Sequence, residues 1–175
     1  MNIEIKQCTI QDVNLLREVS IETFIDTYKD QNTDENMKLH LSKAFSLNQL
    51  EIEISCKNTE FYFIFMNDKI AGYLKINYND AQTKDIGPEC LEIERIYIKK
   101  IYQGKGLGKY LIEHSQEILL QLNMKKIWLV VWERNEKAIQ FYSKKGFIQS
   151  GFHSFYLGDE IQKDIIMLKV VEGKI

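Results

Sequence analysis

The clearest chemical signal in this sequence is a glycine-rich segment that runs from Gln103 to Lys109. Glycines alternate there at Gly104, Gly106 and Gly108, so successive backbone N–H groups can come close to a bound anion. The segment follows an apolar and acidic strand and opens an amphipathic helix, whose N-terminal dipole favours negative charge. The pattern predicts a phosphate-binding loop.

Two common phosphate-binding motifs do not fit this segment. A P-loop requires Ser or Thr after its Gly-Lys pair, but Tyr110 follows Gly108 and Lys109, and Gln103 stands where the earlier glycine is needed. The dinucleotide-binding fingerprint would require its third glycine at Lys109, and the chain before it reads as a hairpin rather than a βαβ unit.

What does fit is Gln103-x-x-Gly106-x-Gly108 after a strand, which resembles the pyrophosphate-binding signature of the GNAT family of acetyl-CoA-dependent N-acetyltransferases. The family's second motif, N-x-x-A-x-x-F-Y-x-K-x-G-F, is present from Asn135 to Phe147. Within the family, the chain resembles the PaiA-type spermidine/spermine N-acetyltransferases of bacteria over almost its full length. That resemblance is carried by the segments SIETF, NMK, SLNQLEIEIS, AGYLKIN, LEIERIYI, NEKAIQFY and HSFYLGDE.

The elements that position these motifs can be read from hydrophobic periodicity and turn residues. We expect a single domain over residues 1–175, with one mixed sheet and helices on its faces. The resemblance implies the GNAT version of this α/β (α+β) class, a mostly antiparallel sheet of about seven strands that is splayed between the fourth and fifth. The expected strands are residues 3–6, 61–66, 69–78, 90–98, 127–132, 147–155 and 162–170, the last two joined by a turn at Gly158 and Asp159. The first expected helix starts at a Thr9–Asp12 capping box. Three more are expected over residues 34–45, 47–54 and 107–122, and the last runs from a cap at Asn135 to Gly146.

The resemblance implies acetyl-CoA as the cosubstrate. The backbone of the strand before the glycine loop would pair with the pantetheine arm, the loop would take the pyrophosphate, and lysines would add charge near the phosphates, although each lysine is equally compatible with a solvated surface position. The residues implied in binding are Ile96, Tyr97, Ile98, Gln103, Gly104, Lys105, Gly106, Leu107, Gly108, Lys109, Asn135, Lys137, Ala138, Tyr142 and Lys144.

The reaction needs a proton acceptor, because an aliphatic amine of pKa about 10 requires roughly 4 kcal/mol to become neutral at pH 7. Glu92 and Glu94 are two residues apart on the strand, hence on one face, and either could serve directly or through water, with Glu94 slightly favoured. The alternative is that both are strand carboxylates paired with Arg95 or a lysine. The resemblance implies that Tyr142 returns a proton to the leaving thiolate; otherwise it packs on the sheet as Phe141 would.

A series of acidic residues bears on which molecule accepts the acetyl group. Glu18, Glu22, Asp26 and Asp30 recur every four residues, which aligns like charges on one side of a helix. The series is either a solvated face or a means of attracting a polycation, with Glu22 and Asp26 the candidate contacts. The resemblance predicts acetyl transfer to a primary amine of spermidine or spermine by direct attack through a tetrahedral intermediate. The alternatives are a protein amino group, an aminoglycoside-like amine, or a non-catalytic acyl-CoA-binding regulatory module.

The composition narrows the classes of partner that this protein is expected to bind. The 23 basic and 25 acidic residues argue against nucleic-acid binding. No run approaches the roughly 18 apolar residues of a transmembrane helix, and the amino terminus does not resemble a signal peptide, so we expect no membrane association and a cytoplasmic location. The three cysteines and three histidines lack metal-ligand spacing, so no metal is expected and the cysteines are interpreted as buried thiols. A homodimer built through the last strands is compatible with the family.

Overall fold

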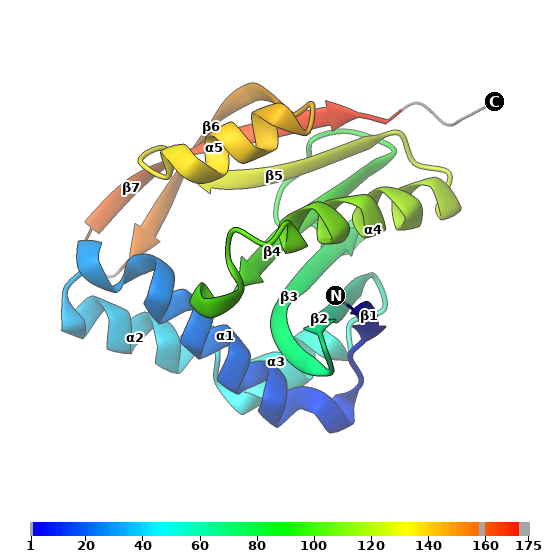
Figure 1. Ribbon diagram of the computed structural model, residues 1–175. Coiled ribbons are helices and arrows are strands. Elements are labelled where there is room, and N and C mark those ends of the chain that lie inside the picture. Colours follow the sequence, from blue (N-terminus) through cyan, green and yellow to red (C-terminus); the bar gives the residue numbers. More distant parts are fainter. Residues whose placement is uncertain (1, 158–159, 172–175) are drawn as a thin grey trace.

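The computed structural model describes residues 2–157 and 160–171, and within them one mixed seven-stranded sheet forms the centre of the molecule (Figure 1). The strand order is β1-β2-β3-β4-β5-β7-β6, and only β4 and β5 pair in parallel among the described strands. The strands are β1 (Ile3–Gln7), β2 (Thr59–Met66), β3 (Lys69–Tyr78), β4 (Cys90–Ile98), β5 (Lys126–Trp132), β6 (Ile148–Leu157) and β7 (Glu160–Val170). The mixed, mostly antiparallel sheet predicted from the sequence is confirmed.

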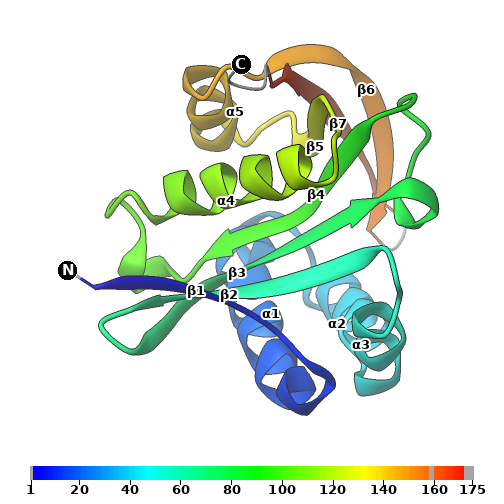
Figure 2. The same ribbon diagram turned by 90° about the vertical axis from the view of Figure 1, so that its right-hand side faces the viewer.

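Helices cover both faces of the sheet (Figure 2). They are α1 (Val13–Tyr28), α2 (Asp34–Ala44), α3 (Leu47–Ile54), α4 (Leu107–Gln121) and α5 (Glu136–Lys144). In this view α1, α2 and α3 lie on one side of the sheet, and α4 and α5 lie on the other. Each side has its own core, one containing Leu16, Phe45 and Tyr73, the other containing Leu111 and Ile127.

The local signals act as expected at the ends of the elements. Thr9 and Asp12 form a capping box ahead of α1, and the Asn67-Asp68 turn between β2 and β3 has positive φ angles of 49° and 62°. The interpretation of all three cysteines as buried is wrong at one position, since Cys56 is exposed in the segment between α3 and β2. The predicted turn at Gly158 and Asp159 lies outside the described residues.

The sheet opens between β4 and β5. Their parallel pairing covers only residues 90–93 of β4 and 126–129 of β5, and both strands continue without pairing to each other. On its other side β4 pairs with β3, where the register shifts so that Ile76 faces Ile93 while Lys75 faces Arg95. Glu94 is therefore the extra residue of a β-bulge, which bends a strand and increases its local twist. Figure 1 shows the two strands adjacent at one end and diverging toward the other, which is the predicted splay.

Candidate active site

A cavity of about 820 Å³ occupies the opening between the diverging strands. Its wall consists of the end of α1, the second half of β4, the glycine-rich loop, the start of α4, the end of β5 and α5 (Figure 1). The volume lies within the range of about 300–1,000 Å³ usual for small-molecule and cofactor sites. The sheet opening thus creates the principal candidate site.

The glycine-rich loop enters the cavity by its backbone. Gly104 and Gly106 have φ angles of 75° and 80°, a left-handed conformation in which other residues are strained, and a Cβ at either position would meet no atom within 4 Å. Gly106 is the N-cap of α4, so the N–H groups of Leu107 and Gly108 have no preceding helical turn to bond. The loop therefore leaves space for an anion to come close and offers it unpaired N–H donors.

Beyond Ile93 the edge of β4 that faces β5 has no strand partner. Ile96, Tyr97 and Ile98 line the cavity along this edge, and the Gln103 side chain fixes its end by donating to the Ile98 carbonyl at 3.0 Å. Unpaired strand edges bind extended ligands through main-chain hydrogen bonds. The splay therefore leaves a strand-like binding surface beside the glycine loop.

The second motif begins where the sequence predicted. The Asn135 side chain accepts a hydrogen bond from the Ala138 N–H at 3.2 Å and caps α5, which ends before Gly146 at a φ angle of 87°. Asn135, Lys137 and Ala138 line the cavity.

The three other lysines implied in phosphate binding do not line the cavity. Lys109 pairs with Glu113 at 3.6 Å, and Lys105 lies over the ring of Tyr102 with its Nζ 5.2 Å from the centroid. Lys144 is exposed in the last turn of α5.

Tyr142 is held in a packed environment on the inner face of α5. Its side chain is 8% exposed, lines the cavity, and contacts the rings of Phe141 and Phe147 at centroid distances of 5.3 and 5.8 Å. Burial raises the pKa of its hydroxyl, and Tyr97 adds to the increase. The hydroxyl has no hydrogen-bond partner among the described residues, so it remains available as a proton donor.

Glu94 lines the cavity within a network of charges. Its Oε2 lies 2.6 Å from Lys75 Nζ and accepts from Asn77 at 2.6 Å, and its Oε1 lies 3.3 Å from an Arg95 nitrogen. Arg95 also makes a bidentate pair with Glu53 of α3 at 2.8 and 3.0 Å. A carboxylate has about four acceptor sites, so Oε1 keeps capacity for a further donor.

Glu92 is separated from the cavity. It is 2% exposed and accepts hydrogen bonds from the Thr83 N–H at 2.8 Å, the Thr83 hydroxyl and the Asn77 amide at 3.1 Å. Burial raises its pKa, although the bonds from Thr83 and Asn77 oppose the increase. Both glutamates accept from the Asn77 amide, so they lie on one face of β4, as predicted. Their place along the strand makes the difference, because Glu92 still pairs with Trp128 of β5, whereas Glu94 lies beyond Ile93, the last paired residue.

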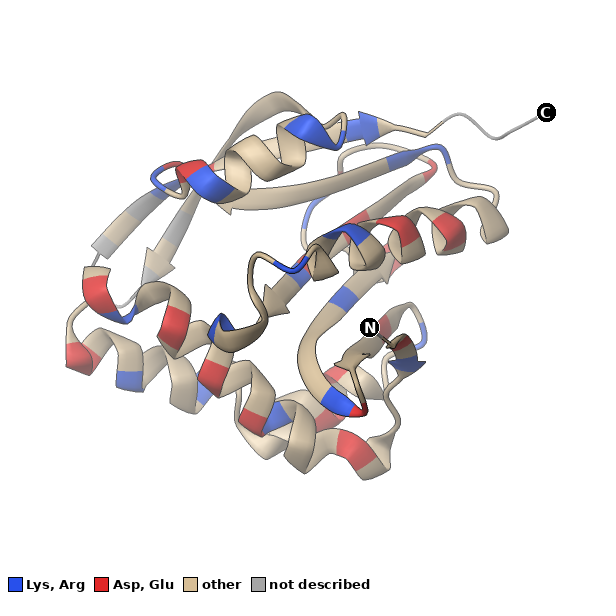
Figure 3. Cartoon of the chain, in the orientation of Figure 1, with Lys and Arg blue, Asp and Glu red and all other residues tan. Residues whose placement is uncertain are grey.

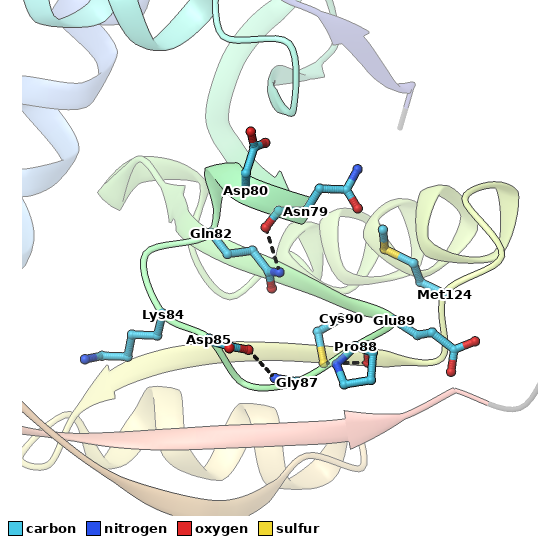
Figure 4. A pocket seen from close by; sticks show the side chains of 10 residues that line it. All are labelled: Asn79, Asp80, Gln82, Lys84, Asp85, Gly87, Pro88, Glu89, Cys90 and Met124. Atoms are coloured by element: carbon cyan, nitrogen blue, oxygen red, sulfur yellow. Dashed lines mark hydrogen bonds between the residues drawn. The ribbon is translucent and has the colours of Figure 1, made fainter.

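A second cavity of about 580 Å³ lies at the β3–β4 loop, near the elements that bury Glu92 (Figure 4). The acidic side chains of this cavity do not converge on one point. Asp85 accepts from the Gly87 N–H at 2.9 Å, while the carboxylates of Asp80 and Glu89 point away from Asp85. Across residues 2–157 and 160–171, no three His, Cys, Asp or Glu side chains are grouped so as to hold a metal ion. In the same ranges no helix combines the length and apolar character of a membrane span.

The first three members of the acidic series lie on α1, where Figure 3 shows red positions recurring along the ribbon, and Asp30 follows in a 3-10 turn at residues 29–31. Asp26 lines the cavity, whereas Glu22 does not line it and is exposed and paired with Lys99 at 2.8 Å. Glu18 and Asp30 are exposed and do not line the cavity.

Three cavity-wall aromatics were not identified from the sequence as a group. The Tyr28 and Tyr97 hydroxyls lie 3.4 Å apart, and the Tyr28 ring centroid is 6.4 Å from that of Trp132. Asp164 of β7 pairs in register with Trp132 and is 7% exposed. Burial raises the pKa of Asp164 from 3.8 to about 6, and the nearby Glu133 adds to the increase.

Comparison with known proteins identifies the family to which this fold and this site belong. Residues 19–147 match the acetyltransferase (GNAT) family, and the chain belongs to it. It is an acetyl-CoA-dependent N-acetyltransferase.

Several relatives are similar over most of their length. The chain is 38% identical over 169 residues to an uncharacterized N-acetyltransferase of Lactobacillus delbrueckii, covering 97% of this chain and 98% of the relative. It is 38% identical over 135 residues to the spermine/spermidine N(1)-acetyltransferase of Bacillus subtilis, covering 73% and 88%. The crystal structure of PaiA N-acetyltransferase from Thermoplasma acidophilum in complex with coenzyme A is similar with a TM-score of 0.79 and 26% identity, covering 98% of this chain and 100% of that one.

Proposed function

We propose that this protein transfers the acetyl group of acetyl-CoA to a primary amine of a polyamine such as spermidine or spermine, by direct attack through a tetrahedral intermediate. The observation that carries the proposal is the sharing of one cavity by the unpaired β4 edge, the glycine loop, Tyr142 and the carboxylate of Asp26. A relative that acetylates spermine and spermidine supports the acceptor class.

The residues present fit coenzyme A at one end of the cavity. The N–H groups of Gly106, Leu107 and Gly108 would hold the pyrophosphate at the start of α4, where the helix dipole favours negative charge. Backbone groups of residues 96–98 would hold the pantetheine arm as an added strand would be held. When bound, acetyl-CoA supplies the thioester whose carbonyl carbon the amine attacks.

The chain's own groups would handle the protons. We assign Tyr142 as the acid, because its buried hydroxyl has no partner among the described residues and its raised pKa keeps it protonated at neutral pH. We assign Glu94 as the acceptor for the amine proton, directly or through water, since it lines the cavity and Glu92 does not. Lys75 and Arg95 hold the Glu94 carboxylate in place.

The acceptor would enter past the end of α1. Asp26 is exposed there and lines the cavity, so it would attract a polycation. Glu22 lies one helical turn earlier on α1, and its charge is partly compensated by Lys99.

The proposal is tested by measuring thiol release from acetyl-CoA with a panel of spermine, spermidine, lysine-containing peptides and aminoglycosides. We expect the highest kcat/KM with a polyamine. A higher kcat/KM with peptides or aminoglycosides would reassign the acceptor, and no release with any amine would indicate a non-catalytic acyl-CoA-binding module.

A further inference from the structure

Asp164 does not itself line the cavity, but it is close enough to two lining residues of the α1 end, Tyr28 and Tyr97, for its charge to add to the increase that burial causes in the pKa of their hydroxyls. Asp164 is 7% exposed and makes no hydrogen bond or ion pair with any residue that the structure describes. Its charged neighbour is Glu133, which carries the same sign. Buried charges in proteins are normally paired, because removal from water is costly unless an opposite charge compensates it. Neither carboxylate oxygen of Asp164 is among the fully buried atoms that lack a partner, so both remain accessible to a group that approaches from outside.

The side chains around Asp164 do not supply that partner. His153 faces it in the β6–β7 register, but burial and the nearby Lys84 lower the His153 pKa, so the imidazole is mainly neutral at pH 7. Arg134 lies over the Trp132 ring, with its guanidinium carbon 6.0 Å from the centroid, and forms no ion pair with Asp164.

Aromatic rings stand next to this carboxylate on the cavity side. Trp132 faces Asp164 across the β5–β7 pair, which directs both side chains to one face of the sheet. The Tyr28 ring centroid lies 6.4 Å from that of Trp132, and the Tyr28 hydroxyl is 3.4 Å from that of Tyr97. Trp132, Tyr28 and Tyr97 all line the cavity. Aromatic faces combined with a carboxylate attract cations such as ammonium groups.

We propose that Asp164, with the rings of Trp132 and Tyr28, binds a non-reacting ammonium group of the acceptor. This inference rests on the proposed function. A carboxylate stabilises the protonated form of a neighbouring amine, so the nitrogen held by Asp164 is not the nucleophile. The acceptor therefore carries at least two amino groups, and Asp164 selects α,ω-diamines and polyamines over monoamines.

The test compares a diamine or spermidine with the primary monoamine of equal length in which a methyl group replaces the distal ammonium. In Asp164→Asn, which preserves shape and removes the charge, we expect KM for the diamine to rise about 10- to 100-fold, the range for losing a charge-assisted bond. KM for the monoamine and for acetyl-CoA should stay within about twofold. Asp68→Asn, an exposed change in the β2–β3 turn, is the matched control.

Thermal melting gives a readout independent of turnover. Diamine at saturating concentration should raise the Tm of the wild-type protein and of Asp68→Asn but not that of Asp164→Asn, while coenzyme A should raise all three. If the wild type prefers diamines and Asp164→Asn keeps that preference, the Asp164 assignment is overturned and the proposed function stands. If the wild type itself shows no preference for acceptors with several amino groups, both are overturned.

Discussion

Replacing Gly72 with alanine tests how closely β3 must approach the cavity-lining strand β4. Gly72 faces Ile98 in the β3–β4 ladder. A Cβ added to it would lie 2.2 Å from the Tyr97 carbonyl oxygen and 3.0 Å from the Ile98 Cα, whereas ordinary contact begins at 3.4 Å. The oxygen contact is thus short by 1.2 Å. Because both neighbours are backbone atoms, relief requires the strands to move apart.

The expected cost follows from this geometry. Overpacking a well-packed interior costs about 1–3 kcal/mol, and a clash with backbone belongs at the upper end, about 3 kcal/mol. For a protein of this size each kcal/mol changes Tm by about 2–4 °C, so Gly72→Ala should lower Tm by about 6–12 °C. Because Tyr97 and Ile98 line the cavity, KM for acetyl-CoA should rise several-fold as well.

The control is Gly151→Ala in β6. A Cβ there would meet only the Ile166 Cδ1 at 3.7 Å among neighbouring atoms, an ordinary contact. Alanine restricts the unfolded chain, so this variant should melt at or slightly above the wild-type temperature. Both variants are measured by calorimetry and by acetyl-CoA titration of the initial rate. Equal Tm values for Gly72→Ala and the control would refute the requirement for close approach.

Three further outcomes are expected. Tyr142→Phe should lower kcat by about 100-fold or more with little change in coenzyme A affinity; near-normal thiol release would remove its role as the acid. Glu94→Gln should lower kcat by a similar factor while Glu92→Gln stays within a few-fold, and the reverse order would exchange the two roles. For Asp164, the raised pKa means that the folded state holds the proton more tightly, so its contribution to stability is lost as pH rises from about 4 to about 6. At pH 8 the unfolding free energy of Asp164→Asn should therefore exceed that of the wild type by up to about 3 kcal/mol. If the same difference persisted below pH 4, titration of Asp164 would not be its cause.

The sequence by itself determined the elements and the two cofactor motifs. Capping residues, turn residues and apolar periodicity are local signals, which is why α3 and β4 occupy the predicted ranges and why Asn135 caps α5. The glycine spacing was equally readable, since the left-handed conformation of Gly104 and Gly106 depends on residue type.

Only the tertiary structure separated Glu92 from Glu94. Strand alternation treats them alike, and both do accept from Asn77. The β4–β5 pairing, however, ends at Ile93, which leaves Glu94 at the opening of the sheet and Glu92 bonded to Thr83. The point at which two strands stop pairing depends on both of them, so no local pattern predicts it.

The proposed acceptor site was likewise decided by tertiary structure. Asp164, Trp132 and Tyr28 come from β7, β5 and α1, and they meet because the sheet order brings β7 next to β5 and the end of α1 against the opening. In the sequence Asp164 is one charged residue in an ordinary strand. Its burial with no counter-ion among the residues that the structure describes is a property of packing between segments far apart in the chain.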